Sequence, residues 1–118
     1  MKTIRVVTKQ AGMLNIPQVQ DVENSTAAKQ KLVCPRGEGA VFARAYDPAL
    51  EIRNIDLYFN ESYLFDSGCT GNFQAGGNML QGPVFFIGHD GEGGSIGLDA
   101  DQIAFIREFI DNSIQQIC

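Results

Sequence analysis

The fold of this chain is decided by residues 98–118, which read LDADQIAFIREFIDNSIQQIC. Asp99 is a favourable N-cap residue, and Gln102 follows it at the spacing of a capping box. Isoleucines then recur at intervals of three or four residues and, at about 100° per residue, fall on one stripe. The pattern predicts an amphipathic helix that packs on a core through Ile103, Ile106, Ile110, Ile114 and Ile117.

The chain before this helix contains short segments in which apolar and polar residues alternate, as they do in strands with one buried face. Strands are predicted at 3–8, 39–46 and 50–59, and a hairpin with arms at 84–87 and 95–98 leads into the helix. The alternation in 50–59 slips by one position at Arg53 and Asn54, which predicts a β-bulge. The predicted inward-facing side chains are Val41, Ala43, Ala45, Leu50, Ile52, Ile55, Leu57 and Phe59.

Two longer segments show no sustained period and are predicted to be connections. Residues 13–31 form the first, with at most a single helical turn that starts at Ser25 or Thr26. Residues 66–82 form the second, a Gly-rich loop that Met79 and Leu80 pin to the core. We therefore expect one α+β domain over residues 1–118. It consists of an antiparallel sheet of about five to six short strands, with one C-terminal helix packed across a face.

The charge is unevenly distributed along the chain. The net charge is −5, and residues 54–118 hold nine acids against one basic residue, Arg107. A negative field of this kind disfavours nucleic acid and anionic membranes, and it steers a basic partner towards the surface. We therefore expect a protein partner with a basic surface, and neither a nucleic acid nor a membrane.

The spacing of the cysteines and the first residues of the chain indicate the cellular compartment of the protein. Cys34, Cys69 and Cys118 form no close pair, which favours reduced thiols over a disulfide framework or a zinc site. A bridge between Cys34 and Cys69 stays open as an alternative. The first residues lack the apolar core of a secretory signal, and no apolar run approaches the roughly 18 residues of a membrane span, so we expect a cytoplasmic protein.

The segment YLFDSGCT, residues 63–70, resembles the catalytic turn of aspartic peptidases, particularly the retroviral and retrotransposon type. The resemblance implies that Asp66 is catalytic, that Ser67 and Gly68 support it, and that two subunits share one active site. Those peptidases also carry an apolar-apolar-Gly segment far downstream. Here Phe86-Ile87-Gly88 follows too soon for the intervening hairpin and strands. The alternative is a Gly turn in which Asp66 bonds to backbone, and no catalytic residue is then expected.

The loop at residues 88–94, GHDGEGG, carries the only histidine of the chain. It lacks the glycine register and the following lysine of a phosphate-binding loop, and Asp90 and Glu92 would repel a phosphate. The spaced ligands of an EF-hand are missing as well, so no metal or other cofactor is expected. A Cys-His nucleophile would have to combine His89 with Cys34 or Cys69, and the alternative is an exposed imidazole at a hairpin tip.

An aromatic edge lies beside the isoleucine stripe of the predicted helix. Phe105 and Phe109 are an i, i+4 pair on this edge, next to the acids Asp101 and Glu108. The rings are covered either by the chain's own loops or by a partner, and aromatic anchors are typical of protein interfaces. These four residues, together with Asp90 and Glu92, are the predicted partner-binding residues, and a homodimer is one form of that contact.

We therefore expect a small acidic, non-catalytic protein that acts by binding another protein. One form is a phage-type or immunity-type inhibitor that occupies a basic site on its partner. The alternative is a structural or assembly subunit that self-associates through the C-terminal helix. The third interpretation, and the weakest, is an aspartic-peptidase-like enzyme that uses Asp66.

Overall fold

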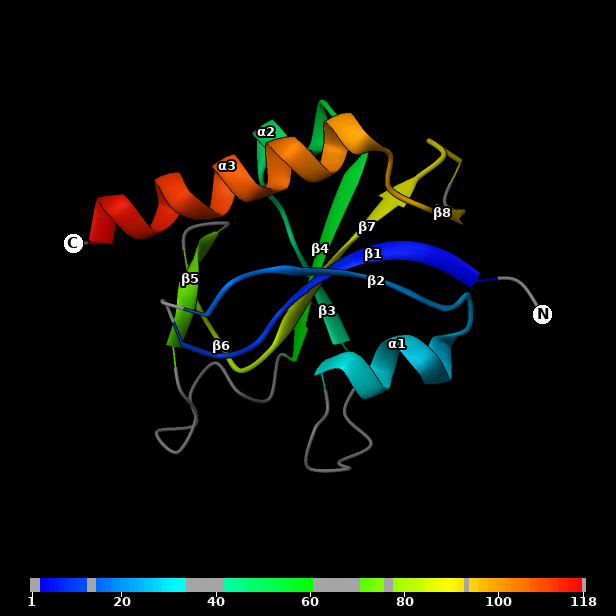
Figure 1. Cartoon of the computed structure of the whole chain (residues 1–118), viewed down its shortest axis with the longest axis horizontal. Helices are drawn as coiled ribbons and strands as arrows, with labels where there is room; N and C mark the ends of the chain where they lie inside the picture. The colour runs from blue at the N-terminus through cyan, green and yellow to red at the C-terminus, as the bar shows by residue number, and fades with distance from the viewer. Residues whose placement is uncertain are drawn as a thin grey trace.

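An antiparallel sheet with a helix on each face forms the body of the computed structural model (Figure 1), which describes residues 3–12, 15–33, 42–60, 71–75, 78–92 and 94–117. The strands are β1 (Thr3–Lys9), β2 (Gln18–Glu23), β3 (Phe42–Ala45), β4 (Ile55–Asn60), β5 (Gly71–Ala75), β6 (Asn78–Gln81), β7 (Val84–His89) and β8 (Ser95–Ile96). The helices are α1 (Thr26–Val33), α2 (Pro48–Glu51) and α3 (Ala100–Ile117).

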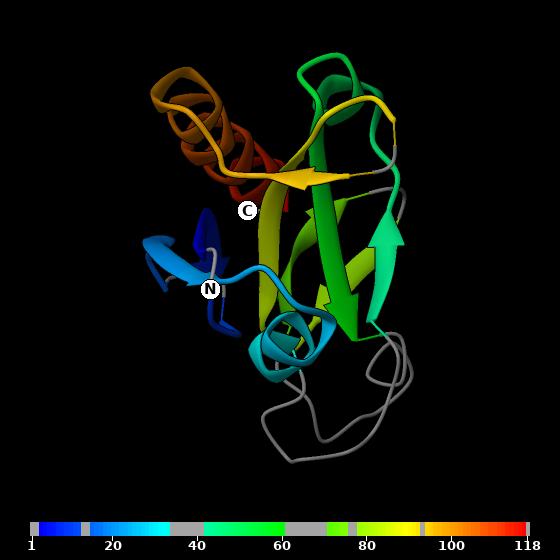
Figure 2. The same cartoon turned by 90° about the vertical axis from the view of Figure 1, so that its right-hand side faces the viewer.

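The main sheet has the strand order β2-β1-β7-β4-β3, with β8 paired to β7, and its strands pair antiparallel. Strands β5 and β6 form a separate two-stranded sheet. The predicted α+β architecture, an antiparallel sheet with a C-terminal helix, is therefore confirmed. Figure 2 shows β1 and β2 passing between α3 and α1, so the two helices cover opposite faces of the main sheet.

Helix α3 begins with the predicted capping box. The Asp99 carboxylate accepts a hydrogen bond from the Gln102 backbone N–H at 2.8 Å, and the Gln102 side-chain oxygen accepts one from the Asp99 N–H at 2.9 Å. Ile106 and Ile110 are buried and Ile103 is partly buried against the core, which confirms the stripe over these positions. The side chains of Ile114 and Ile117 lie outside the described part of the structure.

The sheet carries a separate apolar cluster on each face. One rung of the sheet runs through Val7, Phe86, Leu57 and Ala45, and these side chains join Ile106 and the rest of the large cluster under α3. The smaller cluster lies under α1 and contains the buried residues Val6, Val33, Phe85 and Ile87. Because both faces of β1 are covered, neighbouring residues of this strand are buried, and the simple alternation predicted for residues 3–8 is lost.

The predicted long connection over residues 13–31 is wrong, because it contains β2 and most of α1. Strand β2 is an edge strand, largely exposed on both faces, so its side chains carry no alternating pattern. Its pairing to β1 uses backbone groups, which every residue provides. Helix α1 starts as predicted next to Ser25, whose hydroxyl accepts a hydrogen bond from Ala28 N–H at 3.2 Å, but it continues for eight residues.

The predicted long strand at 50–59 with a bulge is also wrong. Asp47 caps the short helix α2 by accepting from the Ala49 N–H at 2.9 Å, and Pro48 stands in its first turn. Asn54 then adopts a left-handed conformation, with φ of 57°, and turns the chain into β4. The slip in the alternation therefore marks the end of a helix. Ile52, predicted to face inward, is 78% exposed, whereas Leu50, Ile55, Leu57 and Phe59 are buried as predicted.

The second predicted connection, at 66–82, contains the hairpin of β5 and β6. Leu80 is buried as predicted, and Phe73 of β5 also enters the core. The last hairpin is confirmed, although its second arm, β8, has only two residues. Other predictions concern residues or side chains outside the described ranges: the Cys34–Cys69 bridge, the strand before residue 42, Asp66 and its turn, and the side chains of Val41, Ala43 and Met79.

Candidate functional site

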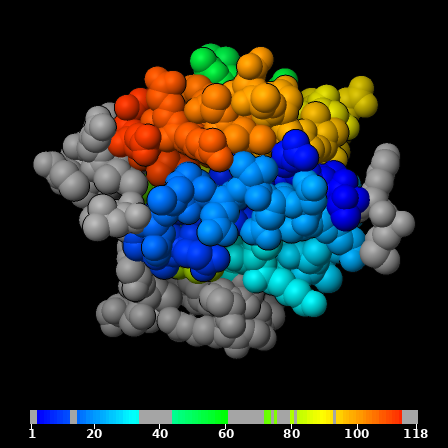
Figure 3. Space-filling view, viewed as in Figure 1, coloured from blue at the N-terminus to red at the C-terminus, as the bar shows by residue number. Residues whose placement is uncertain are grey.

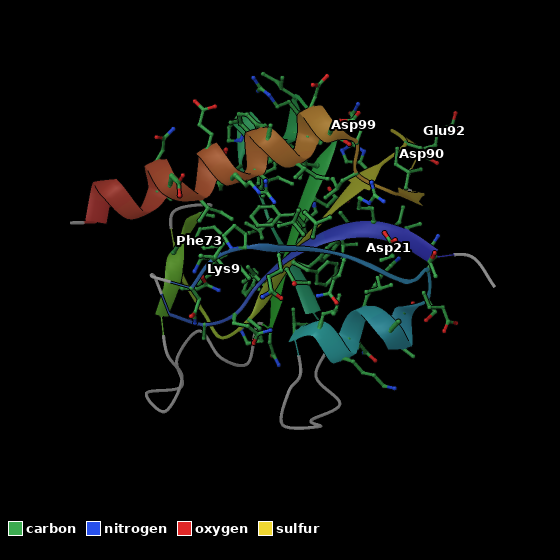
Figure 4. The ribbon with its side chains drawn as sticks, viewed as in Figure 1. Lys9, Asp21, Phe73, Asp90, Glu92 and Asp99 are labelled. Atoms are coloured by element: carbon green, nitrogen blue, oxygen red, sulfur yellow. The ribbon has the colours of Figure 1, made fainter. Side chains whose placement is uncertain are left out.

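Four carboxylates, which we call the acidic end, lie where β7, β8 and the start of α3 meet. Asp90 and Glu92 belong to the loop after β7, and Asp99 and Asp101 belong to the beginning of α3. Figure 4 shows Asp90, Glu92 and Asp99 at the same end of the molecule. The chain brings these groups together because the short strand β8 leads directly back to the helix.

The loop of the acidic end is ordered by its own carboxylate. One oxygen of Asp90 accepts hydrogen bonds from the Glu92 N–H at 2.8 Å and from the Gly94 N–H at 3.0 Å. These backbone donors lower the pKa of Asp90, because they stabilise the ionised form. Gly91, with φ of 85°, supplies the left-handed residue that the turn requires. Asp90 therefore stays ionised at lower pH than an ordinary aspartate.

None of the four carboxylates forms an ion pair within the described residues. Carboxylates elsewhere do form such pairs: Asp21 lies 3.4 Å from the Arg5 guanidinium, and Asp56 lies 3.2 Å from that of Arg44. Asp90, Glu92, Asp99 and Asp101 are all exposed. Their field therefore extends into solvent.

A cavity of about 240 Å³ opens beside the acidic end. It lies between the turn after α2 and the first turn of α3, and Gln102 joins its two sides by donating from its side-chain amide to the Arg53 carbonyl at 2.9 Å and the Asn54 carbonyl at 3.4 Å. The Asn54 carbonyl also accepts from the His89 N–H at 3.0 Å. The lining residues are Arg53, Asn54, Asp99, Asp101 and Gln102.

The predicted aromatic edge of the helix is largely engaged by the chain itself. The Arg53 guanidinium lies 3.8 Å from the centre of the Phe105 ring, a cation–π contact. Phe109 makes edge contacts with Phe73 and Phe86, with ring centres 6.3 Å and 6.4 Å apart. Both helix rings are only partly buried. Of the two rings, Phe105 is thus the one nearer to the cavity, through Arg53.

The structure places the predicted acids of α3 in different surroundings. Asp101 lines the cavity, whereas Glu108, two turns further along the helix, is exposed and does not line it. In the space-filling view, α3 lies directly beside the β1 and β2 surface on this face of the molecule (Figure 3). The predicted partner-binding residues therefore divide into the acidic end, with Asp90, Glu92 and Asp101, and the helix edge, with Phe105, Phe109 and Glu108.

A polar network on the α1 face of the sheet was not predicted from the sequence. Arg44 on β3 pairs with Glu51 of α2 and, at 3.2 Å, with Asp56 of β4. The bond to Glu51 is the main reason why the pKa of Arg44 is raised. Burial, followed by the charge of Asp56, raises the pKa of Tyr58 on the same strand. Alternation alone does not identify the partners of Arg44, because Glu51 and Asp56 come from two separate elements, α2 and β4.

His89 stands at the margin of this network. Its Nδ1 accepts a hydrogen bond from the Gly91 N–H at 3.2 Å, and its Nε2 is 4.0 Å from an Asp56 carboxylate oxygen. Nε2 is buried and has no hydrogen-bond partner within the described part of the chain. The bond from the Gly91 N–H fixes the orientation of the imidazole ring. The same hydrogen bond helps to order the loop that follows β7.

Lys9 is a second polar group that the sequence did not single out. Its ammonium donates to the Gly12 carbonyl at 2.7 Å and to the side-chain oxygen of Asn72, and it lies 5.9 Å from the centre of the Phe73 ring. Only 1% of the residue is exposed. Burial lowers the pKa of Lys9 to about 8. No carboxylate of the described ranges pairs with it, so this interior amine is held by the Gly12 carbonyl, the Asn72 side chain and the Phe73 ring.

No three histidine, cysteine or acidic side chains of the described residues are grouped in a way that could hold a metal ion. The helices that the structure describes include none with the length and hydrophobicity of a membrane span. Comparisons with protein-family models, with curated proteins and with solved structures find no match.

Proposed function

We propose that this chain is a non-catalytic protein that binds a basic surface of a partner protein through its acidic end. The observation that supports the proposal is the gathering of Asp90, Glu92, Asp99 and Asp101 at one end of the molecule without ion pairs among the described residues. Exposed negative charge of this kind accelerates encounter with a basic partner and disfavours acidic ones.

Within this class, the best-fitting role is an inhibitor of phage or immunity type that acts in the cytoplasm by occupying a basic site. The acidic loop suits that role, because Asp90 fixes the loop before binding and less ordering entropy is lost on association. The helix edge would provide further contacts through Phe105, Phe109 and Glu108.

Self-association of an assembly subunit through α3 is the alternative. It is less well supported, because Phe109 packs on Phe73 and Phe86, and Arg53 lies on Phe105. Less aromatic surface is then free for a second copy than the sequence suggested. The peptidase interpretation rests on Asp66, which lies outside the described residues.

Capture of partners from a lysate of the source organism tests the proposal. The immobilised protein should retain a partner at low salt and lose it as salt rises, because screening weakens charge attraction between exposed groups. Glu92→Lys and Asp101→Lys should each reduce capture about fivefold. Asp111→Lys is the matched control, since Asp111 is also exposed on α3 but lies at a distance from the acidic end.

Thermal unfolding of each variant shows whether the fold is retained, since Asp101 also lies in the first turn of α3. Capture that does not depend on salt, or that Asp111→Lys reduces as much as the other two changes, would contradict the proposal. A rise of native mass with protein concentration in the absence of lysate would favour the assembly subunit instead.

A further inference from the structure

The cavity beside the acidic end has two walls of opposite charge. One wall is the turn after α2, which contributes Arg53 and Asn54. The other wall is the first turn of α3, which contributes Asp99, Asp101 and Gln102. Gln102 fixes the spacing of the walls through its hydrogen bonds to the Arg53 and Asn54 carbonyls.

The charged residues of the two walls form no ion pair with each other. Arg53 forms no ion pair with Asp99 or Asp101, although all three line the same cavity. Its guanidinium is held on the Phe105 ring and makes one hydrogen bond, to the Ala49 carbonyl at 3.4 Å. A guanidinium has five N–H donors, so most of them remain free within the described chain.

The acids also keep carboxylate oxygens that make no hydrogen bond within the described residues. One oxygen of Asp99 accepts from the Gln102 N–H, and its other oxygen and the whole Asp101 carboxylate make no hydrogen bond within the described residues. The cavity is thus lined by a basic residue with free donors on one side and by two acidic residues with free carboxylate oxygens on the other. Neither a simple anion nor a simple cation matches both walls, because each would meet one wall of like charge.

We propose that this cavity binds a small zwitterion of the α-amino acid class, with its carboxylate on Arg53 and its ammonium on Asp101 and Asp99. Guanidinium and carboxylate groups bond through paired N–H···O contacts, and an ammonium satisfies carboxylate oxygens with its three donors. The volume of about 240 Å³ is below the roughly 300 Å³ at which pockets for drug-sized ligands begin, so the ligand is small. The site shares Asp99 and Asp101 with the acidic end, but ligand binding needs no protein partner, so it is tested on the purified protein, separately from the proposed function.

Titration of the purified protein with L-alanine tests the site, with backbone amide NMR shifts of Asn54 and Gln102 as the readout. L-Alanine should shift both amides and saturate. N-acetyl-L-alanine lacks the ammonium and L-alaninamide lacks the carboxylate, so each should bind at least about tenfold more weakly. Arg53→Gln and Asp101→Asn should weaken L-alanine binding by about the same factor, whereas the control Asp111→Asn should leave it unchanged.

Three results would overturn the assignment. Equal binding of L-alaninamide would show a cation site, and equal binding of N-acetyl-L-alanine would show an anion site. The absence of any saturable shift with L-alanine would show that the cavity is not a zwitterion site at all. Because Arg53 also packs on Phe105, the variants are first compared with the wild type by amide spectra and thermal unfolding, and Asp101→Asn decides the matter if Arg53→Gln does not fold.

Discussion

The two faces of the main sheet are held together in different ways. The face under α3 is covered by one long helix and by the β5–β6 hairpin, and its side chains form a continuous apolar cluster. The face under α1 is covered by an eight-residue helix over only part of its width, and the remainder carries the network of Arg44, Glu51 and Asp56. The comparison teaches that, among the described residues, the part of the α1 face that α1 leaves uncovered is held by paired charges, whereas the α3 face is held by apolar contacts.

The largest expected effect is on the free energy of unfolding. It tests which face of the main sheet contributes more to stability. Ile106→Ala should lower the free energy of unfolding by about 3 to 4 kcal/mol, because Ile106 is completely buried under α3 and the cavity cannot close. Val33→Ala, in the smaller cluster under α1, should cost about 1.5 to 2 kcal/mol, since fewer methyl groups are removed. Urea denaturation of both variants measures the two values. A larger loss in Val33→Ala would reverse the ranking of the faces.

The next effect concerns Lys9, whose buried amine lies on the α3 face. Its pKa in the folded state is about 8, below the ordinary value of 10.5, so the unfolded chain binds the proton more tightly. The free energy of unfolding should therefore rise between pH 8 and pH 10.5, by about 2 kcal/mol, as the folded state loses its buried charge. Denaturation midpoints across this range provide the measurement.

Lys9→Met should remove most of this pH dependence, whereas the control Lys31→Met, on an exposed residue of α1, should retain it. The difference between the two variants separates Lys9 from other groups that titrate in the same range. If Lys9→Met showed the same rise as the wild type, the stability of the α3 face would not be linked to the Lys9 proton.

The smallest expected effect compares the starts of the two helices. Asp99→Ala removes one of the two reciprocal bonds of the α3 capping box and should cost about 1 to 1.5 kcal/mol. Ser25→Ala removes a single bond of 3.2 Å at the start of α1 and should cost about 0.5 to 1 kcal/mol. Thermal unfolding ranks the two variants. A greater loss for Ser25→Ala would mean that α1 depends on its cap more than α3 does.

The sequence predicted the fold class and the α3 face well, but it predicted the α1 face poorly. The isoleucine period and the Asp99–Gln102 box are local patterns, and so is the alternation of Ile55, Leu57 and Phe59. Strand β2 has no such pattern, because it is exposed and is held by backbone pairing to β1. Helix α1 is short and only weakly amphipathic, so its existence depends on the cluster that it covers.

The residues of the candidate site also divide into those that the sequence predicted and those that it did not. Asp90, Glu92 and Asp101 could be chosen from the sequence, because the acidic second half of the chain is visible there. Arg53 could not be chosen, because its place opposite Asp101 depends on the left-handed turn at Asn54 and on the bonds that Gln102 makes to that turn. The predicted β-bulge at the same position missed this turn, since a slipped alternation does not distinguish a bulge from a helix end.

By itself, the sequence determined which helix is amphipathic, where it starts and that the second half of the chain is acidic, because periodicity, capping and charge are properties of neighbouring residues. Only the tertiary structure decided that Phe105 lies under Arg53, that the acids form one exposed end and that Lys9 is buried beside Asn72. These contacts join residues that are distant in the chain, and their energies depend on burial and on distance, which appear only when the sheet brings its strands together.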